Sequence, residues 1–300
     1  DRYEQGWPEL RVTRMELPEG YVIEPMTAAD VDVLRGWAAS EGWNPGLNDL
    51  RLVWDLAPAS FVALRKGDAL VGGGSILSYE GAFGFMGLFI LRADERGNGL
   101  GTALWHWRRD TLRRRLKPGA SIAMDGVFEM VPFYQRGGFK PAYQVLRYQG
   151  TAQGSDTKDV SALTQAELED IGAYDRRIAQ VPRAAFLRRW LTQPGGFAVG
   201  CRQNGTLVGY GAARPCDTGF KIGPLFADTP EIAALVGQGL MRNFEGEQVQ
   251  IDVPEPNAPG IAWVTDLGLE KVFGCTRLYL DPALDLPLSQ IFSVTSLEFG

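Results

Sequence analysis

The sequence is poor in the residues that build metal and disulfide sites. It contains one histidine, His106, which excludes any site that needs two histidine ligands. The three cysteines, Cys201, Cys216 and Cys275, are widely separated and form no C-x-x-C pair. An odd and sparse set of cysteines argues against a disulfide framework or a zinc cluster and is typical of a reducing compartment. We therefore expect a cytoplasmic protein without a metal cofactor.

Long apolar runs and excess positive charge are also missing. No apolar run reaches the roughly 18 residues that a membrane-spanning helix needs. The opening residues, DRYEQGWPEL, show no basic segment followed by an apolar stretch, so no secretory signal is visible. The chain has 30 Lys and Arg against 36 Asp and Glu, a net charge of −6, whereas nucleic-acid binding needs a basic face. We expect neither a membrane nor a nucleic acid as partner, and the sequence carries no signal of oligomeric state.

What is present suffices for two packed domains. Hydrophobic residues make up 45% of 300 residues, and chains of this length commonly divide in two. The segment FVALRKGDALVGG resembles FAVGCRQNGTLVGY, with Gly72 and Gly209 separated by 137 positions. Later, GGFKPAYQVLRY matches DLGLEKVFGCTRLYL, with Gly138 and Gly268 separated by 130 positions. A repeat of this length indicates duplicated domains rather than a solenoid.

The polar stretch GTAQGSDTKD divides the two copies. We predict an N-terminal extension over 1–20, a first domain over 21–149, a linker over 150–160 and a second domain over 161–300. Hydrophobic periodicity and turn residues predict the elements of the first domain. The expected helices are 27–40, 47–56, 99–116 and 129–136, and the expected strands are 60–66, 70–79, 83–91, 119–125 and 142–149.

Glycines gather where an apolar strand meets a helix. The strand FGFMGLFIL leads through a polar turn to Gly97, Gly99 and Gly101. Glycine lets the backbone approach a ligand closely, and the first amides of a helix lie unpaired at the positive end of its dipole. This combination predicts a pyrophosphate site. A dinucleotide motif would need glycine where Thr102 stands, and the lysine of a P-loop is absent.

Two motifs carry a family resemblance. Arg96, Gly99 and Gly101 resemble the R/Q-x-x-G-x-G/A turn of the GNAT acyltransferases, and Tyr134 to Phe139 resembles the family's Y-x-x-x-G-F. The resemblance covers about residues 21–149 and implies an α/β fold with a mixed, mostly antiparallel sheet flanked by helices. It also implies acetyl-CoA as co-substrate. The residues expected to bind coenzyme A are Phe89, Ile90, Leu91, Arg96, Gly97, Asn98, Gly99, Leu100, Gly101, Thr102 and Arg136.

The second half resembles the degenerate domain of tandem GNAT proteins. Where the first half reads ILRADERGNGLGTALW, the second reads FADTPEIAALV, without the glycine turn. Val264 stands in the place of Tyr134. We therefore expect an active first domain that binds one coenzyme, and a second domain that packs on it and shapes the acceptor pocket.

The resemblance implies direct acyl transfer, with Tyr134 near the coenzyme sulfur as general acid. Many family members carry a glutamate on the strand before the glycine turn, but residues 83–91 contain no acid. The proton acceptor could then be Asp125, Glu80, Glu129 or a water chain. We favour Asp125 because it ends the strand expected beside the thioester, although an aspartate before Gly126 can also serve only the turn.

The loop around Trp43 and Asn44 lies between the first two predicted helices, where family members place part of the acceptor site. An exposed tryptophan beside an asparagine can stack on a small ligand and hydrogen-bond to it, although Trp43 can instead cover the sheet edge. Glu80 is a further candidate for contact with the acceptor. The predicted activity is acetyl-CoA-dependent N-acetylation of a primary amine on a small molecule or peptide. The alternative is a non-catalytic acyl-CoA-binding or regulatory module.

Overall fold

The computed structural model describes residues 17–300, so residues 1–16 of the predicted extension lie outside the described residues. The elements of the first half follow one another in the order expected from the sequence. They are β1 (Tyr21–Pro25), α1 (Ala28–Ser40), α2 (Asp49–Leu56), β2 (Phe61–Lys66), β3 (Ala69–Tyr79), β4 (Phe83–Leu91), α3 (Leu100–Arg115), β5 (Ser121–Val127), α4 (Val131–Arg136) and β6 (Lys140–Thr151).

The second half repeats this order. It contains β7 (Val160–Ala162), α5 (Leu168–Ala179), α6 (Ala184–Leu191), β8 (Phe197–Gln203), β9 (Thr206–Pro215), β10 (Phe220–Ala227), α7 (Pro230–Met241), β11 (Gln248–Pro254), α8 (Ala258–Asp266), β12 (Glu270–Leu280) and β13 (Ile291–Ser293). The stretch from β2 to β6 thus has a counterpart from β8 to β12, and β13 follows the repeat.

Local sequence signals account for where the helices begin. Thr27 caps α1, because its side chain accepts from the Asp30 backbone N–H while the Asp30 carboxylate accepts from the Thr27 backbone N–H. Helix α3 begins directly after Gly99, whose φ of +78° is the left-handed conformation that glycine adopts without strain. The first-half elements lie within a few residues of their predicted bounds.

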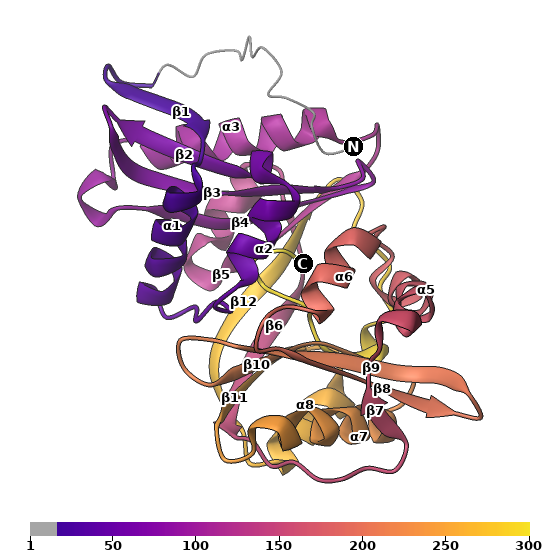
Figure 1. Ribbon diagram of the computed structural model, residues 1–300. Helices are drawn as coiled ribbons and strands as arrows, with labels where there is room; N and C mark the ends of the chain where they lie inside the picture. The colour runs from indigo at the N-terminus through magenta and orange to yellow at the C-terminus, as the bar shows by residue number, and fades with distance from the viewer. Residues whose placement is uncertain (1–16) are drawn as a thin grey trace.

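The strands form one twisted sheet that runs through both halves, in the order β1-β2-β3-β4-β5-β12-β6-β11-β10-β9-β8-β7 (Figure 1). Neighbouring strands are antiparallel except for β4 with β5 and β10 with β11. Helices pack on this sheet, so the mixed, mostly antiparallel α/β fold expected from the sequence is confirmed.

The two halves exchange their last long strand. β12 of the second half pairs with β5, and β6 of the first half pairs with β11 (Figure 1). Leu278 and Leu280 of β12 are therefore buried in one cluster with Leu104 of α3, and Leu146 of β6 is buried with Ile251 of β11. The predicted domain boundaries divide the chain into consecutive segments. In space, each half completes its sheet with a strand of the other half, so the folded units are not consecutive segments.

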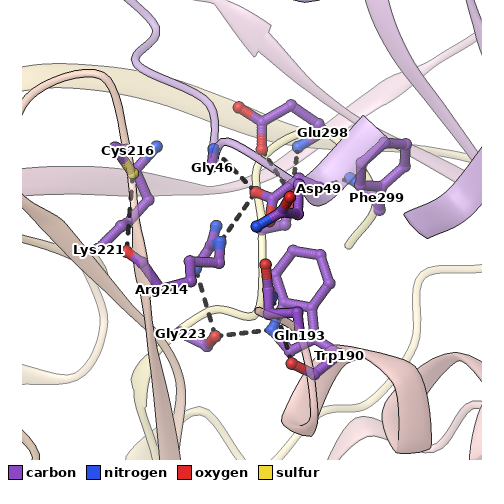
Figure 2. Close-up of polar contacts among 12 residues, drawn as sticks. Gly46, Asp49, Trp190, Gln193, Arg214, Cys216, Lys221, Gly223, Glu298 and Phe299 are labelled. Carbon is purple, nitrogen blue, oxygen red and sulfur yellow. Dashed lines mark hydrogen bonds and ion pairs between the residues drawn. The ribbon is translucent and has the colours of Figure 1, made fainter. Parts of the chain in front are cut away.

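Buried ion pairs tie the halves together. Arg147 of β6 donates to both carboxylate oxygens of Asp252 on β11, at 2.7 and 2.9 Å. Burial alone would raise the pKa of Asp252, but Arg147 holds it below its ordinary value. Away from the exchange, Arg214 of β9 pairs with Asp49 of α2 at 2.8 Å (Figure 2). Removing one partner of such a pair leaves an uncompensated buried charge, so these contacts fix how the halves sit together.

The parallel pairs mark a difference between the halves. β4 and β5 pair only from Phe83 to Phe85 and then part. β10 and β11 pair only from Phe220 to Ile222, but there β13 fills the gap, because Ser293 pairs with Leu225. The Ser293 hydroxyl accepts from the Asp252 backbone N–H on the other side of that gap. No strand occupies the corresponding gap in the first half, within the described part of the chain.

The strand exchange predicts that a chain cut in the linker stays together. Residues 152–159 contain no helix or strand and connect β6 to β7, so a protease site inserted there should be cleaved in the native protein. We expect the two fragments to elute as one species on gel filtration, because separating them breaks the β12–β5 and β6–β11 ladders and exposes both cores. They should separate only in denaturant; fragments that elute apart in native buffer would contradict the exchange.

Candidate active site

A cavity of about 440 Å³ opens where β4 and β5 part. Its wall runs from the glycine turn, at Arg96, Gly97 and Gly101, along β4 to Tyr134 on α4. The helix start, the strand and the tyrosine that the two sequence motifs singled out therefore face one space. Such a cavity, largely apolar with a few convergent polar groups, is the usual form of a ligand site.

Strand β4 is bulged in the middle of this wall. Leu88 has a φ of +55°, and the register against β3 shifts between Gly73 and Ser75. Arg108 of α3 lies beneath the bulge, and its Nη2 donates to the carbonyls of Ser75 and Gly87. Burial lowers the pKa of Arg108 to about 10. A bulge turns backbone groups out of the ladder, and Arg108 holds this one in place.

The glycine turn is shaped to receive an anion. Gly97 and Gly99 have φ of +89° and +78°, and a Cβ at either position would meet no atom within 4 Å. Gly99 precedes α3 without a side-chain cap, so no side chain of that residue covers the first amides. Arg96 donates to the Leu91 carbonyl at 3.0 Å and to Glu41 at 2.8 Å. These groups fit a pyrophosphate, because unpaired helix-start amides and a cation favour negative charge.

Tyr134 lies at the other end of the wall. Its ring stacks on Trp105 with centroids 6.2 Å apart, and a Cβ on Gly126 of β5 would come within 2.6 Å of it. Burial raises the pKa of Tyr134 to about 12, against an opposing effect of Arg108. The phenol is therefore held in position and stays protonated at neutral pH.

Asp125 also lines the cavity, but its carboxylate is engaged. Arg277 of β12 donates to both oxygens, through Nε and Nη2, at 2.7 Å each. Burial raises the pKa of Asp125, and Arg277 opposes only part of that rise. The bidentate pair makes Asp125 part of the contact between β5 and β12.

The other predicted site residues divide between the cavity and its surroundings. Trp43, Phe89, Ile90 and Leu91 line the cavity together with Arg96, Gly97 and Gly101. Asn98, Gly99, Leu100, Thr102 and Arg136 do not line it. The Leu100 side chain belongs to the core at 1% exposure, so only its backbone is available to a ligand. Arg136 is exposed, with its guanidinium over the Phe133 ring.

Two acceptor candidates lie elsewhere. Glu80 is exposed in the turn between β3 and β4, with a φ of +51°, at the opposite end of β4 from the glycine turn. The Asn44 amide donates to the Thr218 carbonyl and to Gln250 at 3.0 and 3.1 Å, so its hydrogen bonds join the two halves instead of facing the cavity. Glu129, an alternative base, is exposed and outside the cavity wall. None of these three residues lines the cavity.

Sequence reasoning missed the part of the wall that the second half supplies. Phe273 and Cys275 come from β12, and Leu297 and Glu298 come from the segment after β13. The strand exchange brings β12 to β5, and no local motif encodes that contact. The signal available in the sequence was that residues 281–300 extend beyond the last repeated segment.

Two family models identify the class of enzyme with this fold and cavity, the acyltransferases that use an acyl-CoA co-substrate. The acetyltransferase (GNAT) family model matches residues 29–139, and a second acetyltransferase (GNAT) domain model matches residues 171–293. The chain belongs to the GNAT family and carries two GNAT domains in tandem.

Relatives cover the whole of both domains. The holothin acyltransferase of Pseudoalteromonas sp. (strain SANK 73390) is 25% identical over 95% of this chain and 97% of its own. A Pyrococcus horikoshii protein assigned as an acetyltransferase superposes with a TM-score of 0.80 at 18% identity, covering 97% of this chain and all of that one. A tandem GNAT protein from the clavulanic acid biosynthesis pathway superposes with a TM-score of 0.62 at 16% identity, covering 88% and 100%. The structural likenesses show the shared fold.

Neither a membrane-spanning helix nor a metal site is found in the described part of the chain. No helix within residues 17–300 is both long and apolar enough to cross a bilayer. No group of three His, Cys, Asp or Glu is placed to hold a metal ion among the side chains that the structure describes.

Close packing at Gly87 predicts a test of this wall. A Cβ there would lie 2.1 Å from the Glu298 carbonyl oxygen, a backbone atom that cannot swing aside. We expect Gly87→Ala to lower the free energy of unfolding by about 1–3 kcal/mol, as overpacking does. The control is Gly36→Ala in α1, where a Cβ meets no atom within 4 Å and helix propensity favours alanine by about 0.5–1 kcal/mol. Urea unfolding midpoints measure both; an unchanged midpoint for Gly87→Ala would mean that the segment does not rest on β4.

Proposed function

We propose that the first domain transfers an acetyl group from acetyl-CoA directly to the primary amine of a small molecule, and that the second domain binds no coenzyme. The observation that carries this proposal is the continuous cavity from the glycine turn, along the bulged strand, to Tyr134. The filled gap between β10 and β11 supports a single coenzyme site per chain. The cytoplasm remains our prediction for the compartment.

The chain offers a distinct contact for each part of the co-substrate. The backbone of residues 96–102 would hold the pyrophosphate, with Arg96 beside it and Arg136 near the outer edge. The edge of β4 at Phe89, Ile90 and Leu91 would hold the pantetheine arm by backbone hydrogen bonds. The bulge at Leu88 would present a backbone amide to the acyl oxygen, where negative charge develops during transfer.

Proton movements fall to side chains of the cavity. Acyl-CoA, when bound, supplies an activated acyl carbon to the acceptor. An alkyl amine has a pKa near ~10, so a carboxylate in the wall must take its proton; Asp125 and Glu298 are both in the wall. Tyr134 holds a proton at its hydroxyl for the departing sulfur.

The acceptor side of the cavity indicates a small molecule with an apolar body. Trp43, Met86, Phe273 and Leu297 surround it with apolar surface. The Trp43 carbonyl accepts from Arg147 at 2.7 Å, which fixes that loop against the second half. The holothin acyltransferase, similar to this chain over nearly its whole length, supports a small-molecule acceptor. A panel of amines with acetyl-CoA, followed by thiol release, tests the activity, and binding without turnover across the panel would favour a non-catalytic acyl-CoA module.

The first prediction for this function is one acetyl-CoA per chain. Calorimetry should give a stoichiometry near one, and two equivalent sites would contradict a coenzyme-free second domain. Gly99→Val should abolish binding, because its side chain would project toward the phosphates. The matched control is Gly246→Val, which has a similar φ of +82° and equally open surroundings, just before β11. Both variants should carry backbone strain of about 1–3 kcal/mol, but only Gly99→Val should lose the coenzyme.

The second prediction concerns Tyr134. Tyr134→Phe keeps the ring packed on Trp105 and removes one hydroxyl, so stability should change little. Loss of a general acid lowers turnover by about 10²–10⁴-fold, and we expect the low end because a thiolate is a fair leaving group. The KM for acetyl-CoA should move much less than kcat. Since the pKa of Tyr134 is raised to about 12, wild-type turnover should not fall with rising pH below about pH 10 through loss of this proton. Turnover within twofold of wild type would show that Tyr134 only packs.

A further inference from the structure

One need of the proposed reaction is unmet by β4, which carries no carboxylate over Phe83–Leu91. Three carboxylates line the cavity: Glu41, Asp125 and Glu298. Glu41 is 40% exposed on its side chain and pairs with Arg96 at 2.8 Å at the glycine-turn end. Asp125 accepts from Arg277 on both oxygens. Glu298 forms no ion pair with a described residue, and it lies after the last of the repeated segments.

The segment 294–300 is held against β4 from two sides. The Phe299 carbonyl accepts from the Tyr79 hydroxyl of β3 at 2.7 Å, and the Phe299 ring packs edge-on against Phe61 of β2. From the second half, the Val294 N–H donates to the Asp252 carbonyl at 2.9 Å. Gly87 of β4 accommodates this segment because it has no side chain: the Glu298 backbone occupies the space that a Cβ would take. The second half thus places the Glu298 backbone beside the residue that precedes the bulge, and Glu298 contributes to the cavity wall.

Glu298 stands apart from the other buried carboxylates. It is 4% exposed. Among the acids whose side chains the structure describes, the other buried ones each form an ion pair with Arg or Lys: Asp30, Asp49, Glu95, Asp175 and Asp252. No ion pair among these described side chains includes Glu298. Its nearest polar partner is the Ser296 hydroxyl, which donates to Oε2 at 2.5 Å.

The second carboxylate oxygen of Glu298 accepts no hydrogen bond from a described residue. In Figure 2 one carboxylate oxygen carries a dashed line, and the other points away from the drawn cluster. Positive charge in the same region comes from Arg147, Arg214 and Lys221. Both arginines are paired with aspartates, and the Lys221 ammonium donates to the Trp43 and Asn44 carbonyls at 3.2 and 2.8 Å. Burial lowers the pKa of Lys221, and the charge of Glu298 opposes that shift. Glu298 lines the cavity, and its carboxylate accepts one hydrogen bond, from a hydroxyl. A carboxylate with one oxygen unengaged is suited to accept a proton.

We propose that Glu298, supplied by the second half, is the proton acceptor for the amine in the first domain's site. This rests on the proposed acetyl transfer. Glu298 takes one proton from the bound ammonium, and the neutral nitrogen then bonds to the acyl carbon. The carbon–sulfur bond breaks with its electron pair on sulfur, which takes a proton from Tyr134. Tyr134 regains a proton from the nitrogen, which loses its second proton as the amide forms, and Glu298 releases its proton to solvent, so the products are the amide and free coenzyme A. Asp125 positions Arg277 and β12 rather than reacting.

The test is Glu298→Gln, which keeps the size of the side chain and an oxygen that Ser296 can reach. We expect kcat with an alkyl amine to fall by about 10²–10⁴-fold, while calorimetry shows an unchanged affinity for acetyl-CoA. The loss should shrink as pH rises toward the pKa of the amine, because the acceptor then arrives deprotonated. It should shrink likewise with a weakly basic aromatic amine at neutral pH. Glu298→Asp, which keeps the carboxylate, should recover part of the activity.

The matched control is Glu245→Gln, the same chemical change at an exposed residue shortly before β11 that does not line the cavity, for which we expect wild-type turnover. Thermal unfolding of each variant verifies the fold. Glu298→Gln with wild-type kcat, or with a loss that is the same at every pH and for every amine, would overturn the assignment while leaving acetyl transfer intact. A wild-type protein that binds acetyl-CoA but acetylates no amine would overturn both.

Discussion

Strands β6 and β12 lie side by side at the centre of the sheet, paired from Glu270 and Gln149 to Tyr279 and Lys140. Each strand belongs by sequence to one half and completes the sheet of the other. Neither core closes without the exchange, since apolar side chains from both strands are buried in the opposite half. The active cavity depends on the same contact, because β12 supplies one wall of it.

In each half two parallel strands, β4 and β5 or β10 and β11, pair for a few residues and then separate. The gap stays open in one half and is filled in the other. In the first half it leaves a cavity beside a bulged β4, over a glycine turn that keeps the start of α3 open. In the second half β13 lies in the gap, and Thr229 caps α7 through its own side chain, which accepts from the Ile232 N–H. The filled gap and the capped start of α7 support our proposal that the second domain binds no coenzyme.

The second domain is therefore more than a remnant of duplication. Its β12 anchors Asp125 through Arg277, and its last segment lies along β4. Because residues of the second half form part of the cavity wall, the cavity has its shape only when both halves are folded together. This dependence explains why buried ion pairs, which are costly to desolvate, recur at the contacts between the halves: Arg147 with Asp252, and Arg214 with Asp49.

The sequence by itself determined the elements and the ligand class. Apolar periodicity and turn residues predicted α1 and α3 to within a residue or two, because these signals are local. Glycines at 97, 99 and 101 after an apolar strand predicted the anion site, since that chemistry needs only neighbouring residues. Tertiary structure alone decided which half completes which sheet, that Asp125 meets Arg277, and that Glu298 reaches Gly87, 211 positions away in the chain. Strand pairing across such distances depends on the closing of two cores at once, and no local pattern encodes it.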